Sequence, residues 1–203
     1  MRQFFCILCS WIITENESIF CNFCERKLEA LIKQPKARMQ GKVKHYYLFK
    51  WGSSNDQLCR RLIYHLKEKP EAFFRFFGKR YNHLKLLDKT VFICPFSKRK
   101  MNHAKSFAST LMKLYLDSSV YEVEAASEAI QPQKRLKRKD RLQKLKGKIY
   151  PSLPISNWVF VDDVLVTGST YYSIYESVGR KPQALFTIFY KELTFENDGE
   201  CFK

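Results

Sequence analysis

The segment WVFVDDVLVTGST, from Trp158 to Thr170, constrains the fold more than any other part of the chain. An apolar strand leads into a loop of one glycine and small hydroxyl residues, and a segment of helical character follows, with Gly179 as its expected end. This order predicts half of a βαβ unit. Two adjacent carboxylates, Asp162 and Asp163, stand at the end of the strand. A buried turn with an acidic helix cap is the plain alternative, although a cap needs only one carboxylate.

The same pattern recurs earlier in the chain, where an apolar strand at 88–96 is followed by a basic loop and by a helix that begins near Ala104. Apolar and aromatic runs predict further strands at 45–51, near 120–125 and at 182–191. Helical spacing predicts two helices, at 57–69 and 71–78. Alternating strands and helices predict an α/β fold with a mostly parallel sheet flanked by helices. In such sheets ligands bind outside the carboxyl ends of the strands.

Four of the seven cysteines form two C-x-x-C pairs near the N-terminus, with eleven residues between the pairs. Each pair can turn two thiolates onto one tetrahedral metal ion, so we predict a structural Zn²⁺ bound by Cys6, Cys9, Cys21 and Cys24. Four thiols that hold no metal are the alternative. We assign residues 1–40 to this zinc-binding knuckle and a polar linker, and residues 41–203 to the α/β domain. The sequence leaves open the roles of three further thiols, Cys59, Cys94 and Cys201.

The chain is strongly basic, with 36 Lys and Arg against 20 Asp and Glu and a formal net charge of +16. A polyanionic partner is therefore expected, and nucleic acid, a phosphorylated ligand and an anionic membrane surface all fit. The alternative is that many of these cations only keep the chain soluble. Nine of the 18 residues from 131 to 148 are Lys or Arg. We interpret this segment either as a solvated surface helix or as an anion-binding arm over a phosphorylated ligand.

The N-terminal segment is basic and then apolar, but its apolar run is short and is interrupted by the first cysteine pair. These features do not favour a signal peptide. No later apolar run reaches the roughly 18 residues that a membrane-spanning helix needs. We therefore expect a cytoplasmic protein without a transmembrane segment, whose charge could hold it at the cytoplasmic face of an inner membrane.

The loop after the carboxylate pair suits a phosphate monoester. Gly168 permits a close approach of the backbone, while Thr167, Ser169 and Thr170 add hydroxyl donors at the start of a helix, where the dipole favours an anion. Carboxylates do not bind phosphate, but they accept hydrogen bonds from two neighbouring hydroxyl groups or hold a hydrated Mg²⁺. A ribose 5-phosphate group carries a diol and a phosphate at about this separation.

This motif resembles the loop that binds phosphoribosyl pyrophosphate (PRPP) in type I phosphoribosyltransferases. The chain as a whole resembles the ComF family, which joins a four-cysteine zinc knuckle to a phosphoribosyltransferase-like domain. The four clustered cysteines, LIYHLKEKP, ICPFSKRK and VFVDDVLVTGST carry the resemblance. A Q-x-x-L-x-x-x-x-R spacing formed by Gln133, Leu136 and Arg141 adds to it. The chain departs from the family at three places. The segment KRKMNHAK keeps Asn102 but lacks the Arg-Gly of the family. Val166 stands where the family has a Thr, and Lys144 stands where the family has an Asn.

The resemblance implies a role for each matched position. Asp162 and Asp163 would be the catalytic pair that contacts the ribose hydroxyls and Mg²⁺. The loop that cradles the 5-phosphate would consist of Val164, Leu165, Val166, Thr167, Gly168, Ser169 and Thr170. Three cations in the first loop would face the pyrophosphate, namely Lys98, Arg99 and Lys100. The basic arm at 131–148 would close over the ligand or bind nucleic acid through Lys134, Arg135, Lys137, Arg138, Lys139 and Arg141.

The ComF family is associated with natural transformation, so the resemblance implies a protein that binds PRPP and single-stranded DNA and supports the uptake and handling of incoming DNA. Other DNA-uptake proteins at the inner membrane are further expected partners. Two alternatives remain open. The first is a metabolic phosphoribosyltransferase that transfers ribose 5-phosphate to a base or another acceptor. The second is a binding module that responds to PRPP without turnover. The acceptor and the oligomeric state are left open.

Overall fold

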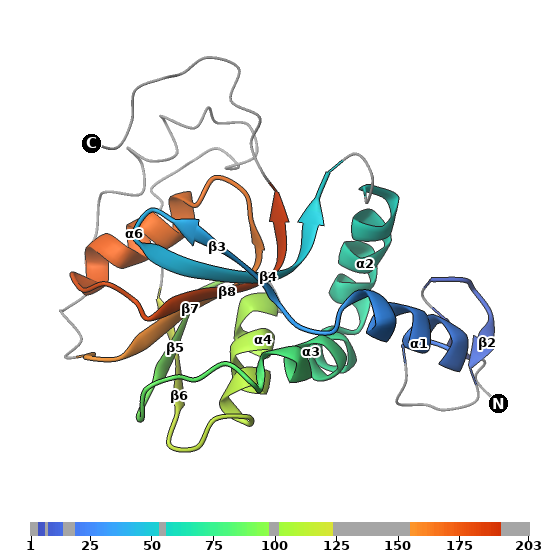
Figure 1. Cartoon of the computed structure of the whole chain (residues 1–203), viewed down its shortest axis with the longest axis horizontal. Coiled ribbons are helices and arrows are strands. Elements are labelled where there is room, and N and C mark those ends of the chain that lie inside the picture. The colour runs from blue at the N-terminus through green and yellow to red at the C-terminus, as the bar shows by residue number, and fades with distance from the viewer. Residues whose placement is uncertain are drawn as a thin grey trace, which may run out of the picture.

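The computed structural model describes residues 4–6, 8–13, 19–52, 56–97, 102–123 and 155–191 (Figure 1). In these ranges a six-stranded sheet has the strand order β3-β4-β8-β7-β5-β6. Only the β3–β4 pair is antiparallel, which confirms the predicted α/β fold with a mostly parallel sheet. The strands are β3 (Lys36–Gln40), β4 (Val43–Trp51), β5 (Val91–Pro95), β6 (Ser119–Val123), β7 (Trp158–Leu165) and β8 (Ala184–Lys191).

Three helices cover one face of the sheet: α2 (Asp56–Glu68), α3 (Pro70–Gly78) and α4 (His103–Met112). Phe73, Phe74 and Phe77 are fully buried in α3 and pack in one core with Val161 of β7 and Phe186 of β8. Phe76 of the same helix is partly buried and packs against this core. Burial of one such side chain contributes about 1.5–3 kcal/mol, so this cluster is a main source of stability.

The opposite face carries α6 (Ser169–Val178). Its apolar stripe of Tyr171, Ile174 and Val178 packs in a second core that includes Phe160 and Leu185 of the sheet. The helix ends at Gly179, as predicted, and this glycine has a φ of 69°. The sheet is thus enclosed between two helical layers.

The segment expected as a linker contains the edge strand β3 instead, so the expected boundary at residue 40 falls inside a β-hairpin. Gly41 has φ 59, which suits the tight turn between β3 and β4. Most β3 side chains are at least partly exposed, so the strand lacks the apolar pattern by which buried strands are recognised in a sequence.

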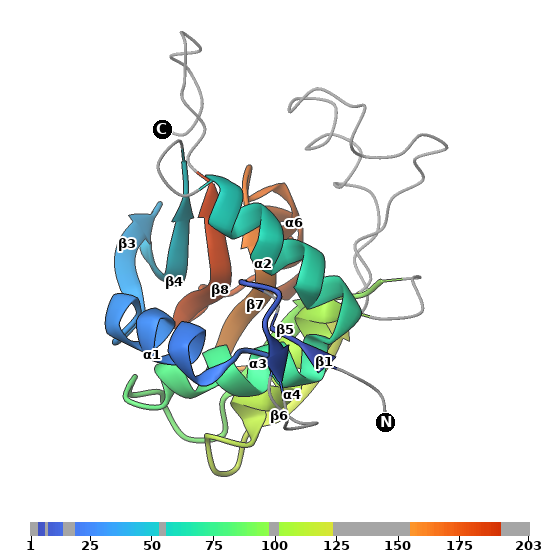
Figure 2. The ribbon, with the colours of Figure 1, turned by 90° about the vertical axis from the view of Figure 1, so that its right-hand side faces the viewer.

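The N-terminal unit consists of a short antiparallel pair, β1 (Phe4–Phe5) and β2 (Ile12–Ile13), and of α1 (Asn22–Leu31). Figure 2 shows it in front of α3 and beside α2. Phe20 is 1% exposed, and its ring centroid lies 4.9 Å from that of Phe76 and 5.9 Å from that of Phe77. The unit therefore shares its core with the helices of the sheet.

The order of the strands reverses at β5. The chain passes from β5 through α4 to β6 on one side, whereas β7, α6 and β8 lie on the other side of β5. The carboxyl ends of β5 and β7 consequently flank a topological switch point, which is where ligands bind in sheets of this kind. Within the described ranges, no helix is both long and apolar enough to cross a lipid bilayer.

Candidate functional site

Asp162 and Asp163 lie within the last residues of β7 rather than beyond its end, because the strand continues to Leu165. Asp162 is in register with Thr187 of β8. The backbone N–H of Asp163 donates a hydrogen bond of 2.8 Å to Oδ1 of Asp162. The two carboxylates, both half-buried, therefore occupy the switch point that the topology defines.

The two carboxyl groups have pKa values that are shifted in opposite directions. Burial raises the pKa of Asp162 well above its usual range, and the negative charge of Asp163 raises it further. Burial pushes the pKa of Asp163 upward as well, but hydrogen bonds with His103 and Asp162 and the electrostatic interaction with His103 outweigh it and bring that pKa below its usual value. A pair of this kind carries its negative charge mainly on Asp163, and a bound cation would favour ionisation of both.

His103 is the side chain of α4 that contacts the carboxylate pair. It is the first residue of α4, and its Nδ1 atom lies 3.6 Å from Oδ2 of Asp163. The two side chains are 17% and 26% exposed, so the pair borders solvent. The sequence analysis did not single out His103. The one available signal was its place directly after Asn102 in the loop that follows a parallel strand.

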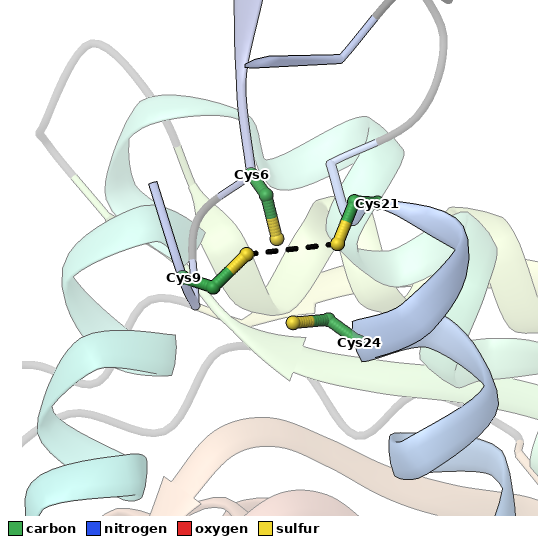
Figure 3. A group of neighbouring side chains, drawn as sticks. All are labelled: Cys6, Cys9, Cys21 and Cys24. Atoms are coloured by element: carbon green, nitrogen blue, oxygen red, sulfur yellow. Dashed lines mark hydrogen bonds between the residues drawn. The ribbon is translucent and has the colours of Figure 1, made fainter. Parts of the chain in front are cut away.

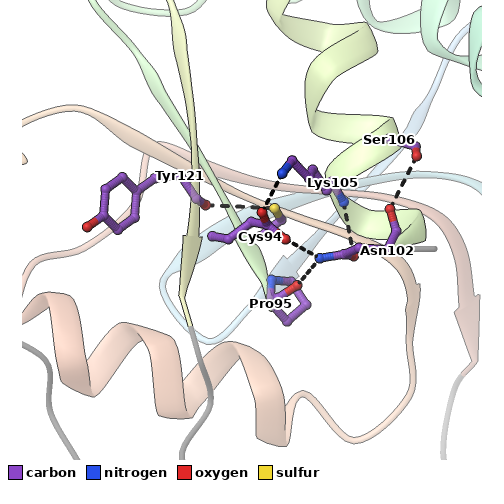
Figure 4. Close-up of polar contacts among 7 residues, drawn as sticks. Cys94, Pro95, Asn102, Lys105, Ser106 and Tyr121 are labelled. Atoms are coloured by element: carbon purple, nitrogen blue, oxygen red, sulfur yellow. Dashed lines mark hydrogen bonds and ion pairs between the residues drawn. The ribbon is translucent and has the colours of Figure 1, made fainter. Parts of the chain in front are cut away.

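Asn102 anchors the start of α4 to two strand ends (Figure 4). Its Oδ1 accepts the backbone N–H of Lys105 at 3.2 Å and caps the helix, while its Nδ2 donates to the carbonyl oxygen of Pro95 at 2.9 Å and to Oε1 of Glu122 at 2.7 Å. Nζ of Lys105 in turn lies 2.7 Å from Oε2 of Glu122. This network links β5, β6 and α4, and it thereby fixes the position of the neighbouring His103.

The loop between β7 and α6 brings a glycine with a positive φ to the start of the helix. Gly168 has φ 73 and immediately precedes the helix, and it offers no side chain to cap the free N–H groups of the first turn. Oγ1 of Thr167 accepts the backbone N–H of Ser169 at 3.2 Å and lies 2.8 Å from the Ser169 hydroxyl oxygen. In this structure the loop therefore satisfies part of its own hydrogen-bonding capacity.

The other residues of the predicted loop differ in their exposure to solvent. Val164 and Thr170 are half-buried, Val166 is exposed, and Leu165 is 3% exposed in the core. The side chain of Leu165 cannot reach a ligand, so any contact there would come from its main chain. The three first-loop cations at 98–100 and the arm at 131–148 lie outside the described residues, and their predicted roles stay predictions.

The tip of the β3–β4 hairpin lies close to the loop between β7 and α6 and to the first turn of α6. A Cβ atom added to Gly168 would lie 3.3 Å from Nε2 of Gln40 and 3.3 Å from the ring of Tyr172. A Cβ atom on Gly41 would lie 3.8 Å from the Tyr172 hydroxyl oxygen. Because the hairpin tip and the first turn of α6 approach this closely, glycine at position 168 is needed for space as well as for its positive φ.

The four N-terminal cysteines converge as predicted (Figure 3). All four sulfur atoms lie within 4.8 Å of one another, and Sγ of Cys9 is 3.6 Å from Sγ of Cys21. A tetrahedral Zn²⁺ with bonds of about 2.3 Å requires sulfur atoms roughly 3.8 Å apart, so the donor set fits this ion. Four thiolates leave no open coordination position, which makes the site structural.

The surroundings of Cys6 favour its thiolate. Burial alone would raise the pKa of this thiol, but backbone N–H groups of Cys21, Cys9 and Leu8 donate hydrogen bonds to the sulfur and lower the pKa to about 7. Cys6 and Cys24 are buried whereas Cys9 is exposed, so one side of the cluster is part of the core and the other faces solvent.

No protein-family model matches this chain, and a search of curated proteins gave no match either. Its function is therefore inferred from the fold and from the side chains at the switch point and in the cysteine cluster.

Proposed function

We propose that this chain is a ComF-like protein of natural transformation that binds PRPP with Mg²⁺ and single-stranded DNA. One observation carries the PRPP half of the proposal. A carboxylate pair near the end of β7 stands a few residues before a glycine turn at the N-terminus of α6, and both lie at the switch point of a mostly parallel sheet. A diol acceptor and an anion cup are thus joined in one short segment.

Each part of the site has a defined task in this proposal. Asp162 and Asp163 accept hydrogen bonds from the ribose hydroxyls and hold a hydrated Mg²⁺, for which carboxylate oxygens are suitable ligands. The backbone N–H groups from Gly168 to Thr170 and the hydroxyls of Thr167 and Ser169 bind the 5-phosphate. A bound Mg²⁺ supplies charge neutralisation at the pyrophosphate.

His103 positions the carboxylate pair. Its contact with Asp163 fixes one carboxylate and concentrates negative charge there. If PRPP is turned over, the protein contributes positioning and charge stabilisation, because departure of pyrophosphate from C1 requires no protein nucleophile.

The nucleic-acid half of the proposal rests on charge. A net charge of +16 on 203 residues supplies the electrostatic attraction on which binding to single strands depends. The metabolic phosphoribosyltransferase is the second candidate. The asymmetric carboxylate pair favours it, because a catalytic site needs such tuned groups. The departures in the first loop favour the third candidate, a binder without turnover.

The PRPP site is tested by isothermal titration calorimetry with PRPP and MgCl₂. We expect binding to the native chain and a loss of at least tenfold in affinity in the double variant Asp162→Asn/Asp163→Asn, because neutral amides no longer attract the metal. Tyr64→Ser serves as a matched control, because Tyr64 is 62% exposed on α2, away from the switch point. Equal affinity in the double variant and the native chain would refute the site.

Pyrophosphate release from PRPP, measured with and without a single-stranded oligonucleotide, separates the three functions. Release that needs a free base indicates the metabolic enzyme, and release that needs DNA indicates turnover coupled to DNA. Binding without any release indicates the non-catalytic module. Oligonucleotide affinity should also fall steeply between 50 and 200 mM salt and on neutralisation of Lys137, Arg138 and Lys139. DNA affinity that responds to neither change rules out the nucleic-acid half.

A further inference from the structure

The four-cysteine cluster has a buried side and a side that faces solvent (Figure 3). Cys6 and Cys24 are 2% and 6% exposed and belong to the main core. Cys21 is half-buried, and Cys9 is exposed. Sγ of Cys9 lies 3.6 Å from Sγ of Cys21. The two sulfur atoms on the solvent side of the cluster are therefore direct neighbours.

The backbone leaves this solvent-side pair room to move. Cys9 lies in the turn between β1 and β2, and Cys21 precedes the first residue of α1. Cys24, in contrast, lies inside α1, and the backbone N–H of Cys6 donates to the carbonyl oxygen of Trp11. Because the sulfur atoms of a disulfide are about 2.05 Å apart, Cys9 and Cys21 would have to approach each other by only about 1.5 Å to form one.

Cys9 also borders an open space. It lines a groove of about 410 Å³ between the N-terminal unit and α2. Cys24 lines the same groove, but its burial leaves little of the side chain open to a reagent. A molecule as small as hydrogen peroxide can consequently reach Cys9 without a change in the fold.

The other described thiols are poor targets for an oxidant. Cys59 and Cys94 are 0% exposed, and burial raises their pKa values to about 11 and about 12, so both stay protonated near neutral pH. The low pKa of Cys6 gives it no advantage in the zinc-loaded protein, because the ion deprotonates all four of its ligands. Accessibility then decides which thiolate reacts first, and it selects Cys9.

We propose that Cys9 and Cys21 are the site of a reversible oxidation by hydroperoxides that releases the zinc ion. The thiolate of Cys9 attacks one oxygen of the peroxide, the O–O bond breaks, and the departing hydroxide takes up a proton to become water. Cys9 is then a sulfenic acid. The thiolate of Cys21 attacks its sulfur, and the S–S bond forms while the second hydroxide leaves and is protonated. Two electrons pass in total from the two sulfur atoms to the peroxide.

The disulfide changes the zinc site but keeps the segments around it together. Cys6 and Cys24 remain as two ligands, fewer than the four of a structural zinc site, so the chain loses its hold on the ion. The new bond still joins the turn after β1 to the start of α1. A thiol reductant and fresh Zn²⁺ can therefore restore the site without reassembly of the whole unit. This proposal is independent of PRPP binding.

The test uses the zinc-loaded full chain with hydrogen peroxide as the only oxidant. A chromogenic zinc indicator records release of the ion, and intact mass spectrometry records the loss of two hydrogen atoms. Free thiols are then blocked with N-ethylmaleimide, and peptide mapping identifies the bridge. We expect release in step with a bridge between Cys9 and Cys21, and blocked thiols at Cys6 and Cys24. A bridge between any other pair, or oxidation with retained zinc, would overturn the proposal.

Two variants assign the separate roles. Cys9→His keeps a zinc ligand, because three thiolates and one imidazole form a common structural site, but it lacks the sulfur that reacts first. Its zinc release by peroxide should be at least tenfold slower than that of the native chain. Cys21→His keeps the attacking sulfur without its partner, so dimedone should label Cys9 as a sulfenic acid. Labelling of another cysteine instead would contradict the assigned order.

Cys59→Ala is the matched control, because it removes a thiol outside the cluster and should release zinc at the native rate. Zinc content and circular dichroism before oxidation establish that each variant is folded. Equal release rates in Cys9→His and the native chain would refute the role of Cys9. Dithiothreitol followed by Zn²⁺ should return the oxidised native chain to its original zinc content. If zinc content does not recover, the oxidation is not the reversible one proposed.

Discussion

Nδ1 of His103 lies 3.6 Å from Oδ2 of Asp163 and joins the start of α4 to the end of β7 across the switch point of the sheet. The two residues are 60 positions apart in the sequence (163 − 103), and nothing local brings them together. The contact arises because β5 and β7 are neighbours and their carboxyl ends point to the same edge. It makes Asp163 the more acidic member of a carboxylate pair.

Replacement of His103 should therefore alter the ionisation of Asp163. In His103→Gln the contact with the imidazole is lost while burial remains, so we expect the pKa of Asp163 to rise. Carbon-13 NMR of the carboxyl groups over a pH titration measures this shift. His83→Gln is the control, since this histidine lies outside the site in the turn after α3. A pKa of Asp163 that is the same in both variants would contradict the assigned contact.

Gly168→Ala should destabilise the fold. The residue has φ 73, and the added Cβ would approach both Gln40 and Tyr172 to 3.3 Å. Backbone strain of this kind costs about 1–2 kcal/mol, and the free energy of unfolding in urea should fall by that amount. Gly52→Ala is a matched control, because a Cβ there meets nothing within 4 Å. Similar losses in the two variants would mean that the loop has no special backbone requirement.

Phe20→Ala should loosen the N-terminal unit from α3. The side chain is 1% exposed against Phe76 and Phe77, and truncation of a buried phenylalanine costs about 3–5 kcal/mol. Thermal unfolding of the zinc-loaded protein should detect the loss. Phe23→Ala, which removes an equal volume at 73% exposure, should change stability by less than about 0.5 kcal/mol. If both variants have the same unfolding temperature as the native chain, the two units do not share a core.

Stability should decrease toward acid pH partly because of His45. Burial, with a contribution from the charge of Arg38, lowers its pKa from 6.5 to about 3. The unfolded chain takes up a proton below about pH 6.5 and the folded chain does not until about pH 3, so this contribution is complete above pH 6.5 and is lost as pH falls through that window.

His45→Gln isolates the effect, because glutamine can keep a hydrogen bond to Oγ1 of Thr187, which lies 2.7 Å from Nε2 of His45, but takes up no proton. Unfolding in guanidinium chloride at pH 7, 5 and 4 should give a fall of a few kcal/mol in the native chain and a smaller fall in the variant. Parallel curves for the two proteins would assign the acid sensitivity to other groups.

Most of the sheet could be predicted from the sequence, because β5, β7 and β8 are apolar runs followed or preceded by clear helix and glycine signals. The edge strand β3 could not, since its side chains are mostly at least partly exposed and its pairing with β4 depends on a turn at Gly41. The four-cysteine cluster was predicted correctly, because each C-x-x-C pair brings two thiols together and both pairs lie in one short segment.

The candidate site was predicted only as far as local sequence allows. The segment from Asp162 to Thr170 carries its carboxylates, its glycine turn and its hydroxyls in one stretch. His103, Glu122 and Gln40 come from other elements, and only strand order brings them to that stretch or to its network. The position of His103 directly after Asn102 was the one local signal for these contacts.

The hydroxyl of Thr167 has a consequence for the loop that forms the phosphate part of the proposed PRPP site. It accepts the backbone N–H of Ser169 and also contacts the Ser169 hydroxyl, so in this structure the entrance of α6 holds an internal hydrogen-bond acceptor. A ligand oxygen that accepts the Ser169 N–H would therefore have to replace the Thr167 hydroxyl as its acceptor. A ligand with a single oxygen would form one hydrogen bond in place of the one that Thr167 already provides, so the net number of hydrogen bonds would not increase. In the proposed PRPP site, a phosphate with three terminal oxygens could accept further hydrogen bonds from this loop, whereas a ligand with one oxygen could only replace the threonine.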